Sequence, residues 1–586
     1  MKKIIYSILA LASSIALTGC WGLDYYTKAA LSEETFLDRS SDVDKLMAGV
    51  YGQMKSNYCF GYDFLFDSVT DIAIGSNKQA YDQGQSTYSD SWFQSCWQQT
   101  YNLANYANAA LRNLKNVEAM DPDDPDAAGR ITTTQRNQAI NECKFLRALA
   151  YFRLINLFGD IPYYDETWDT AATFMDRFVT PSSVAEVREK ILADLTDAIN
   201  GLPVAWPTTS YGRATQTAAY ALRGKVKLFS GDNAGAISDF EWVVSNGRSG
   251  ATSVSLDPSY RNVFRVFGVG KRSPEMIFSI QNSNTNGMAT TTIMGNKASL
   301  RQMATDGMNP STKLVEMYEK SDGGKFDWNE YLPGWNEATP AQRQSMVAIT
   351  IKTDAAGVAY VDDLLAADTT AMARAYRERD PRLMVSCITP YSTYLGTTAG
   401  SKAQTFNYWL VDATKSISPA SVGNGTMINW SGVYTPSYFV RKFVIEGNET
   451  GGEYTNAPYE WPVIRYADVL LMLAEAYNAT GNDTKAQDCL NQVRSRVGMP
   501  AVSLTGTELR DYIRDERARE LPFEGHRFFD LRRWGIASQV IPGQVKTIYG
   551  EVIYTKAYPD KYNIWPIPSV ELDRTPAFKE FQKPGW

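Results

Sequence analysis

The sequence is poor in the residues that most metal sites and hydrolases need. Its 586 residues include one histidine and six cysteines, and no two cysteines form a C-x-x-C pair. Zinc sites usually combine several imidazole and thiolate ligands, so a metal site is not expected. His526 is the only base for a Ser-His-Asp arrangement, and neither a Gly-x-Ser-x-Gly turn nor a phosphate-cradling glycine loop is present. We therefore predict no metal, no cofactor and no serine-based catalysis.

Positive charge is not in excess either. The chain has 58 lysines and arginines against 65 acidic residues, which gives a net charge of −7. Proteins that bind nucleic acid neutralise phosphates with clustered basic side chains, and this sequence has no basic stripe or arginine-rich tract. Nucleic acid is therefore excluded as a partner. Beyond the N-terminus, no stretch is apolar enough to span a membrane.

The N-terminus has the pattern of a bacterial lipoprotein signal. Two lysines at positions 2 and 3 precede an apolar run over residues 4–17, and residues 17–20 read LTGC. The run is too short for a stable membrane span and is typical of a cleaved signal peptide. We predict that residues 1–19 are removed and that Cys20 becomes the lipidated first residue. Two or more acyl chains on one cysteine make an effectively permanent membrane anchor.

The other five cysteines are expected to be structural. Cys143 and Cys489 lie on apolar helical faces, where a thiol behaves as a small buried hydrophobe. Cys59 and Cys96 are the one pair considered for a disulfide, because the predicted compartment is oxidising.

The strongest internal signal is a pair of helices that recurs at an offset of 250 residues. The aligned pairs are Gly224/Ala474, Gly231/Gly481, Asp232/Asn482, Ala236/Ala486, Phe240/Leu490 and Val243/Val493. Small residues twelve apart, followed by a large apolar residue four positions later, resemble the tetratricopeptide pattern of two antiparallel helices. Gly231 and Gly481 occupy positions where a helix ends with a left-handed residue. We predict two equivalent helical hairpins.

Two further helical pairs are indicated upstream. Leu195, Ala198 and Pro203 keep the repeat's spacing after a helix predicted over about residues 135–158. A fourth unit is predicted to begin with Ser41 as its N-cap, and its partner helix is expected over residues 97–117.

Between about residues 250 and 460 the composition changes to Gly, Thr, Ser, Asn and Tyr with short apolar runs. Helical periodicity fades there, and long irregular segments inside a compact protein are usually functional. We predict one domain over residues 20–586. In it, a mainly α scaffold of helical pairs, about 40–248 and 460–535, carries a loop and short-strand insertion over about 250–460.

Five ordered segments give the sequence its most specific signature. They are residues 143–163 (CKFLRALAYFRLINLFGDIPY), 379–383 (RDPRL), 461–478 (WPVIRYADVLLMLAEAYN), 514–535 (RDERARELPFEGHRFFDLRRWG) and 564–568 (IWPIP). Together with the lipoprotein signal, these segments and their order resemble the SusD-like (RagB/SusD) family of Bacteroidetes outer-membrane lipoproteins. The resemblance covers nearly the whole mature chain.

The resemblance implies a tetratricopeptide-containing α-helical fold and a lipid anchor that places the protein on the cell surface. It also implies capture of glycans, without catalysis, for delivery to a SusC-like TonB-dependent transporter. Peptide is the alternative cargo, because the family includes members that resemble peptide-capture proteins. A glycoside hydrolase is the alternative of another class, since two carboxylates can always be drawn from 65 acidic residues.

Charged residues in these segments are interpreted as structural. The acids and bases of residues 514–535 alternate at spacings of three and four, which predicts intrahelical ion pairs. Arg465 and Asp468 are spaced likewise. We expect a partly buried charge network that fixes the scaffold.

Two loops interleave aromatic residues with amides and acids, as a sugar-binding surface requires. The first runs over residues 77–83 and leads on to Tyr88 and Trp92, and the second covers residues 326–336. Trp97, by contrast, is expected to pack in a helix. The predicted ligand contacts are Asn77, Tyr81, Trp92, Trp328, Tyr331 and Trp335.

Overall fold

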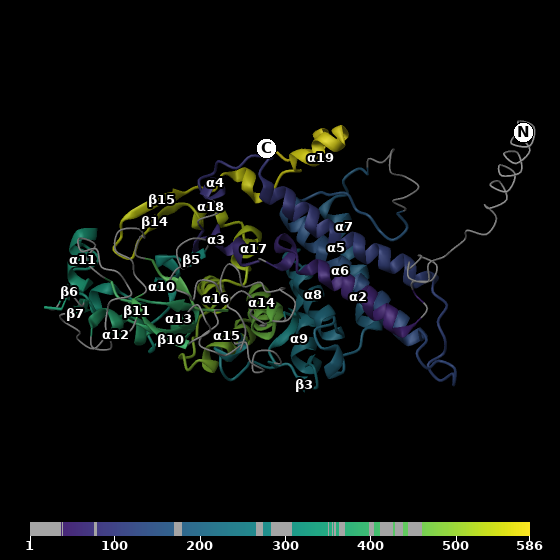
Figure 1. Cartoon of the computed structure of the whole chain (residues 1–586), viewed down its shortest axis with the longest axis horizontal. Helices are drawn as coiled ribbons and strands as arrows, with labels where there is room; N and C mark the ends of the chain where they lie inside the picture. The colour runs from purple at the N-terminus through teal and green to yellow at the C-terminus, as the bar shows by residue number, and fades with distance from the viewer. Residues whose placement is uncertain are drawn as a thin grey trace, which may run out of the picture.

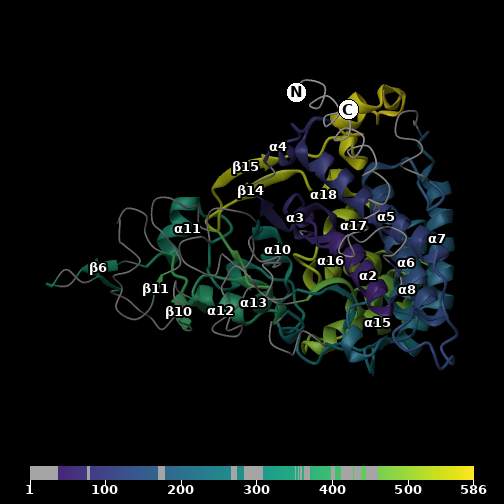
Figure 2. The same cartoon turned by 45° about the vertical axis from the view of Figure 1, so that its right-hand side comes forward.

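The computed structural model describes residues 37, 39–61, 63–75, 79–168, 179–264, 273–282, 308–349, 351–353, 355–356, 359–361, 370–397, 403–410, 426–427, 437–443 and 460–586. The predicted signal peptide, Cys20 and Asn77 lie outside the described residues. In Figures 1 and 2 the long helices α5, α6 and α7 occupy one end of the molecule, and α11, α12 and β6 occupy the other. The fold is mainly α, as predicted.

The first part of the chain is almost entirely helical. Its elements are α2 (Ser40–Met54), η1 (Asn57–Gly61), α3 (Phe64–Ser68), β1 (Ala73–Gly75), α4 (Gln79–Asp82), α5 (Ser91–Asn116), α6 (Thr133–Phe158), α7 (Val184–Gly201), η2 (Thr208–Ser210), α8 (Gln216–Phe229) and α9 (Asn233–Asn246).

Short elements follow. They are β2 (Arg248–Ser249), β3 (Thr252–Ser253), η3 (Asn262–Phe264), β4 (Met276–Ile280), β5 (Met308–Pro310), α10 (Thr312–Met317), η6 (Trp328–Glu330), α11 (Pro340–Val347), β6 (Ile351–Thr353), β7 (Ala359–Val361), α12 (Ala371–Arg377), α13 (Arg382–Ser386), β8 (Cys387–Ile388), β9 (Thr393–Thr397), β10 (Ala403–Asn407), β11 (Thr426–Met427) and β12 (Phe439–Val440).

Helices return in the last part of the chain. The elements are β13 (Trp461–Arg465), α14 (Tyr466–Ala479), α15 (Asp483–Arg496), α16 (Gly506–Glu520), α17 (Arg527–Arg533), α18 (Ala537–Val540), β14 (Gly543–Lys546), β15 (Val552–Lys556), η8 (Asp560–Asn563), α19 (Ser569–Arg574) and η9 (Pro576–Phe581).

The predicted internal repeat is confirmed. Helices α8 and α9 and helices α14 and α15 begin and end 250 residues apart, at 216/466, 229/479, 233/483 and 246/496. A Cβ atom on Gly224 would lie 2.6 Å from the Phe240 ring, so the small residue is required for α8 and α9 to pack closely. Gly231 and Gly481 have φ of +85° and +79°, the left-handed conformation expected after a helix.

The two upstream pairs also form, with shifted boundaries. Helix α6 packs on α7, and α2 packs on α5. Helix α2 begins at Ser40 after Arg39, so the prediction of Ser41 as N-cap is wrong by two residues. Helix α5 begins at Ser91, where the Asp90 side chain accepts a hydrogen bond from the Trp92 amide at 2.9 Å. The predicted start near Trp97 therefore missed the first turns of the helix.

Strands in the described part of the chain are short and pair locally or across the insertion. Strand β4 pairs antiparallel with β13, and β1 pairs antiparallel with β5. The first of these pairs joins the start of the insertion to the strand that leads into α14. The pairing of β4 with β13 therefore attaches the start of the irregular middle segment to the helical scaffold.

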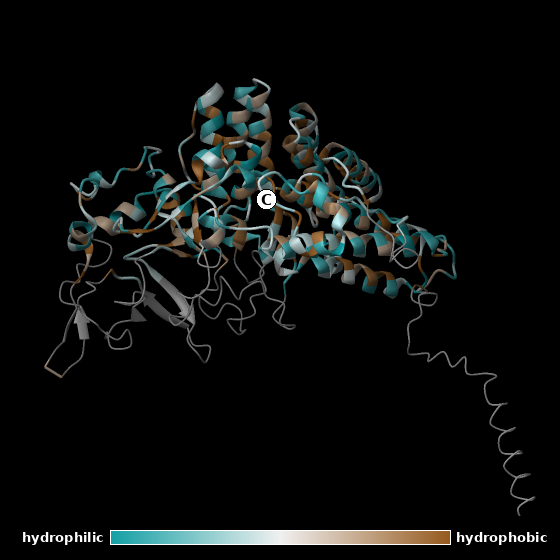
Figure 3. Cartoon of the chain, turned by 90° about the horizontal axis from the view of Figure 1, so that it is seen from above, coloured by the Kyte–Doolittle hydropathy of each residue, from teal (hydrophilic) through white to brown (hydrophobic). Residues whose placement is uncertain are grey.

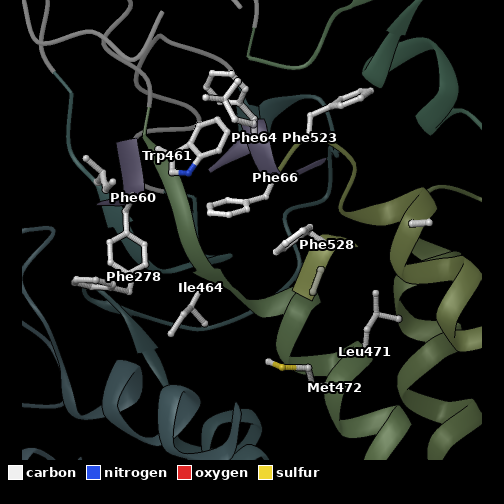
Figure 4. Packing of buried hydrophobic residues seen from close by; sticks show 14 of the residues in the cluster. Phe60, Phe64, Phe66, Phe278, Trp461, Ile464, Leu471, Met472, Phe523 and Phe528 are labelled. Carbon is white, nitrogen blue, oxygen red and sulfur yellow. The ribbon is translucent and has the colours of Figure 1, made fainter. Parts of the chain in front are cut away.

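The core is rich in aromatic residues. Figure 4 shows Phe60, Phe64, Phe66, Phe278 and Trp461 converging from η1, α3, β4 and β13, and all five rings are nearly inaccessible to solvent. Along the helices in Figure 3, hydrophobic and hydrophilic residues alternate around the axis, as in helices with one buried face. Cys143 and Cys489 are buried, as predicted. Cys59 is a buried free thiol, so the considered disulfide with Cys96 is not formed.

A buried charge network connects the insertion to the C-terminal helices. The Arg465 guanidinium contacts carboxylates of Glu275 at 2.5 Å, Glu520 at 2.7 Å and Glu524 at 2.7 Å, and all four side chains are fully buried. Arg382 reaches Glu516 and Glu520 in the same way.

The expected network is therefore present, but the predicted intrahelical pairing is mostly wrong. Within the 514–535 segment, the pairs Arg519–Glu516 and Arg533–Asp530 are intrahelical. Most other ion pairs of this segment reach another element, because buried side chains on α16 face the strands and helices packed over them.

Candidate ligand-binding site

The first predicted aromatic cluster is buried rather than exposed. Trp92 lies on helix α5 with 1% of its surface accessible, and Tyr81 is 2% accessible. Both rings pack against Trp565, at centroid distances of 4.9 and 6.1 Å. The prediction that these aromatics are exposed on a loop is wrong, because the C-terminal segment folds back over them. That long-range contact has no local signature in residues 77–92.

The second predicted cluster forms a compact turn. Trp328 and Trp335 are buried with ring centroids 5.2 Å apart, and the Trp328 indole donates a hydrogen bond to Glu316 at 3.1 Å. An exposed role for these two indoles is therefore also wrong. Tyr331 is only partly buried and lies beside Phe326. Of the predicted aromatic contacts, Tyr331 alone keeps a solvent-facing position, and its role stays a prediction.

A cavity of about 540 Å³ lies elsewhere, at the junction of the scaffold and the insertion. Three segments form its walls: one face of α2 from Asp44 to Lys55, the connection 209–213 before α8, and the end of β4 at residues 279–281. Its volume is in the range of small-molecule sites in proteins. The floor is apolar, with Met47, Met54 and Ile280.

A buried carboxylate behind one wall, outside the cavity lining, holds that wall in place. Glu142 of α6 is fully buried and accepts a hydrogen bond from the Tyr51 hydroxyl at 2.6 Å. The Arg213 guanidinium donates to both oxygens of Glu142, through Nε at 2.9 Å and through Nη2. The Tyr51 hydroxyl also accepts from the Ala214 amide at 2.8 Å. These bonds fix the connection before α8 against α2.

The opposite wall is polar. The Tyr211 hydroxyl donates to Glu460 at 3.4 Å, and Ser279 donates to the same carboxylate at 3.4 Å. Gln281 contributes an amide that donates to the Ser279 hydroxyl at 2.9 Å. Gly212 has φ of +94° and carries no side chain where a Cβ atom would lie 2.5 Å from Gln281. A tight left-handed turn thus brings the two walls together.

Burial and pairing set the charges around Glu142. Burial raises the pKa of the Glu142 carboxyl, although Arg213 and Tyr51 partly offset the shift. Burial also raises the pKa of Tyr51 well above its usual range, and the charge of Glu142 raises it further. For Arg213, burial lowers the pKa, but hydrogen bonds and charge from Glu142 outweigh burial and raise it. Arg213 is therefore a cation at neutral pH.

Sequence reasoning did not find this cavity for a physical reason. Its polar residues, such as Asp44 and Lys55, lie on an amphipathic helix whose polar face is normally solvated. The one available signal was Gly52 in the last turn of α2, because glycine destabilises a helix and this one also lines the cavity.

A second, smaller cavity of about 70 Å³ lies between α6, α8 and residues 524–530. Lys225 in its wall is 3.2 Å from Asp468 and 3.5 Å from Nδ1 of His526. Burial lowers the pKa of His526 to about 4, so the imidazole is neutral at pH 7. The charged groups of this wall pair with one another, as in a structural cluster.

Within the described ranges, no group of three or more histidine, cysteine, aspartate or glutamate side chains is arranged to hold a metal ion. No helix in the same part of the chain has the length and apolarity needed to cross a membrane.

Comparison with known proteins decides the family. The sequence model of the SusD family matches residues 274–586, which is more than half of the chain. The chain belongs to the SusD family. A second family model, described as starch-binding proteins associating with the outer membrane, matches residues 23–228 of this SusD-family protein.

Individual relatives extend over nearly the whole SusD-family chain. SusD-like protein P2 of Formosa agariphila is 24% identical over 567 residues, covering 92% of both chains. A SusD-like protein of Bacteroides fragilis superimposes with a TM-score of 0.70 at 21% identity, covering 95% of this chain and 99% of that one. Surface glycan-binding protein A of Bacteroides thetaiotaomicron, in complex with laminarihexaose, gives a TM-score of 0.60 at 17% identity and covers 93% and 99%. The predicted family and fold are confirmed.

Proposed function

We propose that this protein binds glycans at the outer membrane and delivers them, uncleaved, to a SusC-like TonB-dependent transporter. Membership of the SusD family supports the proposal, and a relative of the same fold is in complex with laminarihexaose. The observation that carries it for this chain is the cavity beside α2.

The lining of that cavity suits a sugar. Sugar rings present apolar C–H faces as well as hydroxyl groups, and ligand sites combine an apolar surface with a few placed polar groups. Here Met47 and Met54 supply the apolar floor, and Tyr211, Arg213 and Gln281 supply a ring and hydrogen-bonding groups. A peptide would also find polar partners, but the family match favours a glycan.

Binding without cleavage is supported by the acids around the cavity. Glycoside hydrolysis uses two carboxyl groups that flank the scissile bond, roughly 5–9.5 Å apart. Asp44 is the one acidic side chain among the residues that line the cavity. Glu142 lies behind the wall and is occupied by Tyr51 and Arg213. A second exposed carboxylate is therefore missing from this set of residues.

Attachment to the membrane is proposed to occur through Cys20, with residues 1–19 removed as a signal peptide and the folded part facing the cell surface. We also propose that residues 20–586 form one domain. The ion pairs of Arg465 with Glu275 and Glu520 support this, because they join the insertion to the C-terminal helices.

Binding is tested by isothermal titration of the full mature chain with laminarihexaose and with hexasaccharides of other linkages. Wild-type protein is expected to bind at least one of them, and Tyr211→Ala is expected to weaken that binding by about 1–3 kcal/mol. Tyr106→Ala is the matched control, since Tyr106 is a half-exposed tyrosine on α5 that does not line the cavity. Failure to bind any glycan, or release of shorter products, would contradict the proposal.

Attachment is tested by fractionation of cells that produce Cys20→Ala protein. The variant is expected in a soluble fraction, whereas the wild-type chain is expected in the outer membrane. Retention of Cys20→Ala in the membrane would count against the lipid anchor.

A further inference from the structure

In the cavity beside α2, the hydrogen-bond donor Arg213 is held in place next to an exposed acceptor, Asp44. Arg213 uses Nε and Nη2 for Glu142, and the face of its guanidinium lies 4.2 Å from the centroid of the Trp206 ring. The remaining nitrogen, Nη1, lies 3.4 Å from Oδ1 of Asp44, whose side chain is 59% exposed. The guanidinium is thus held in place before any ligand arrives.

The local charges are balanced. Asp44 is an acid and Lys55 a base in the lining, and Glu142 lies behind Arg213. Two positive and two negative groups therefore surround the cavity. Because Arg213 is already paired with Glu142 and Asp44, an anionic sugar would gain little from its charge and would be repelled by the Asp44 carboxylate. An uncharged pair of neighbouring hydroxyls can instead donate to Asp44 and accept from Arg213 at the same time.

The wall of α2 leaves room for a sugar ring. A Cβ atom added to Gly52 would meet no other atom within 4 Å, and the neighbouring wall residue Ala48 is also small. Packing inside the chain therefore does not require glycine at position 52, even though glycine weakens a helix interior. Gly52 is also one of the residues that line the cavity.

We propose that this cavity selects uncharged glycans, that Arg213 and Asp44 together bind a vicinal diol of one sugar ring, and that another ring of the same glycan is seated against Gly52. The inference rests on the proposed function, because it names the class of glycan and the contacts within the same cavity.

The first experiment compares charged and uncharged probes. Isothermal titration uses laminarihexaose, cellohexaose and mannohexaose against hexagalacturonate, all with the full mature chain. We expect an uncharged hexasaccharide to bind at least about tenfold more tightly than hexagalacturonate. Preference for hexagalacturonate would overturn this inference and leave glycan capture intact. Absence of binding to every glycan would overturn both.

The second experiment locates the ring seated against Gly52 with two glycine substitutions on one helix. Gly52→Leu fills the open wall, and we expect it to weaken binding of the preferred uncharged probe by about tenfold or more. Gly49→Leu is the matched control, because Gly49 lies on the same helix, also has open space around it and does not line the cavity. Equal affinity of Gly52→Leu and wild-type protein would overturn the inference.

The third experiment tests the hydrogen bond between Asp44 and the sugar diol. Asp44→Asn keeps the shape of the side chain but removes its charge, and Asp44 is too exposed for the change to unfold the protein. Loss of one charge-assisted hydrogen bond should weaken binding of the uncharged probe about tenfold. Hexagalacturonate should bind to Asp44→Asn at least as tightly as to the wild-type protein. Unchanged affinity for both probes would overturn the assignment of the diol to Asp44.

Discussion

Two arginines of this protein are held by carboxylates in different ways, and the difference separates structure from function. Arg465 meets Glu275, Glu520 and Glu524 in a cluster from which solvent is excluded. Arg213 meets one buried acid, Glu142, and its Nη1 edge reaches an exposed one across the rim of a cavity.

A buried arginine indicates a binding role only when part of its hydrogen-bonding edge faces an open space. All partners of Arg465 come from the chain itself, and they join β13, α16 and the start of the insertion. Such a cluster has no room for a solute. The cluster around Arg465, here called the closed cluster, therefore makes the scaffold rigid. The cluster around Arg213, the open cluster, instead offers a fixed donor to a ligand.

Breaking the closed cluster should give the largest effect on stability. Arg465→Ala leaves three buried carboxylates without their common partner, so we expect a loss of about 3–5 kcal/mol in the free energy of unfolding. Arg213→Ala should cost less, because Glu142 can take up a proton and the Arg213 side chain is 19% exposed. Urea unfolding followed by circular dichroism measures both. Equal losses would show that the two clusters do not differ.

The same contrast applies to the aromatic residues. Trp92→Ala removes a ring packed against Phe66 and Trp565, and we expect it to destabilise the fold by about 3–5 kcal/mol. Tyr331→Ala, at a partly exposed position, should change stability much less. Thermal unfolding compares the two. Near-normal stability of Trp92→Ala would restore Trp92 as a candidate surface residue.

These aromatic residues also show how far the sequence could predict the molecule. The repeat was found because Gly224, Ala236 and their partners 250 residues later encode local packing, and local packing follows from short-range spacing. Burial of Trp92 depends on Trp565, more than 470 positions away, and no local pattern encodes that contact. The family could be identified, but the cavity could not, because residues from three distant segments form it.

Acid should affect the two kinds of carboxylate in opposite directions. Burial raises the pKa of Glu516, but Arg382, Arg519 and Arg494 lower it more, to about 2. A group with a lowered pKa stabilises the folded protein above its ordinary pKa, and that stabilisation is lost as pH falls. Burial raises the pKa of Asp67 to about 7, so its contribution weakens as pH rises through that value.

We therefore expect stability to rise modestly as pH falls from 7 to about 5 and then to fall steeply from about pH 4.5 to pH 2. The first window is governed by groups with a raised pKa, such as Asp67, and the second by the arginine-bound acids, such as Glu516. Unfolding temperatures measured across this range test the order of the two windows. A steep loss that begins near pH 6 would mean that the closed cluster does not dominate.

Breaking an exposed ion pair should have the smallest effect on the free energy of unfolding. Arg374 and Glu378 lie one turn apart on and just after α12, 3.3 Å apart, with side chains 56% and 50% exposed. Solvent screens such a pair and both side chains lose freedom when it forms, so Arg374→Ala should change stability by less than about 0.5 kcal/mol. Urea unfolding at low and high salt gives the measurement. A loss comparable to that of Arg465→Ala would mean that ion pairing alone, rather than burial together with closure of every partner, determines which arginines hold this fold together.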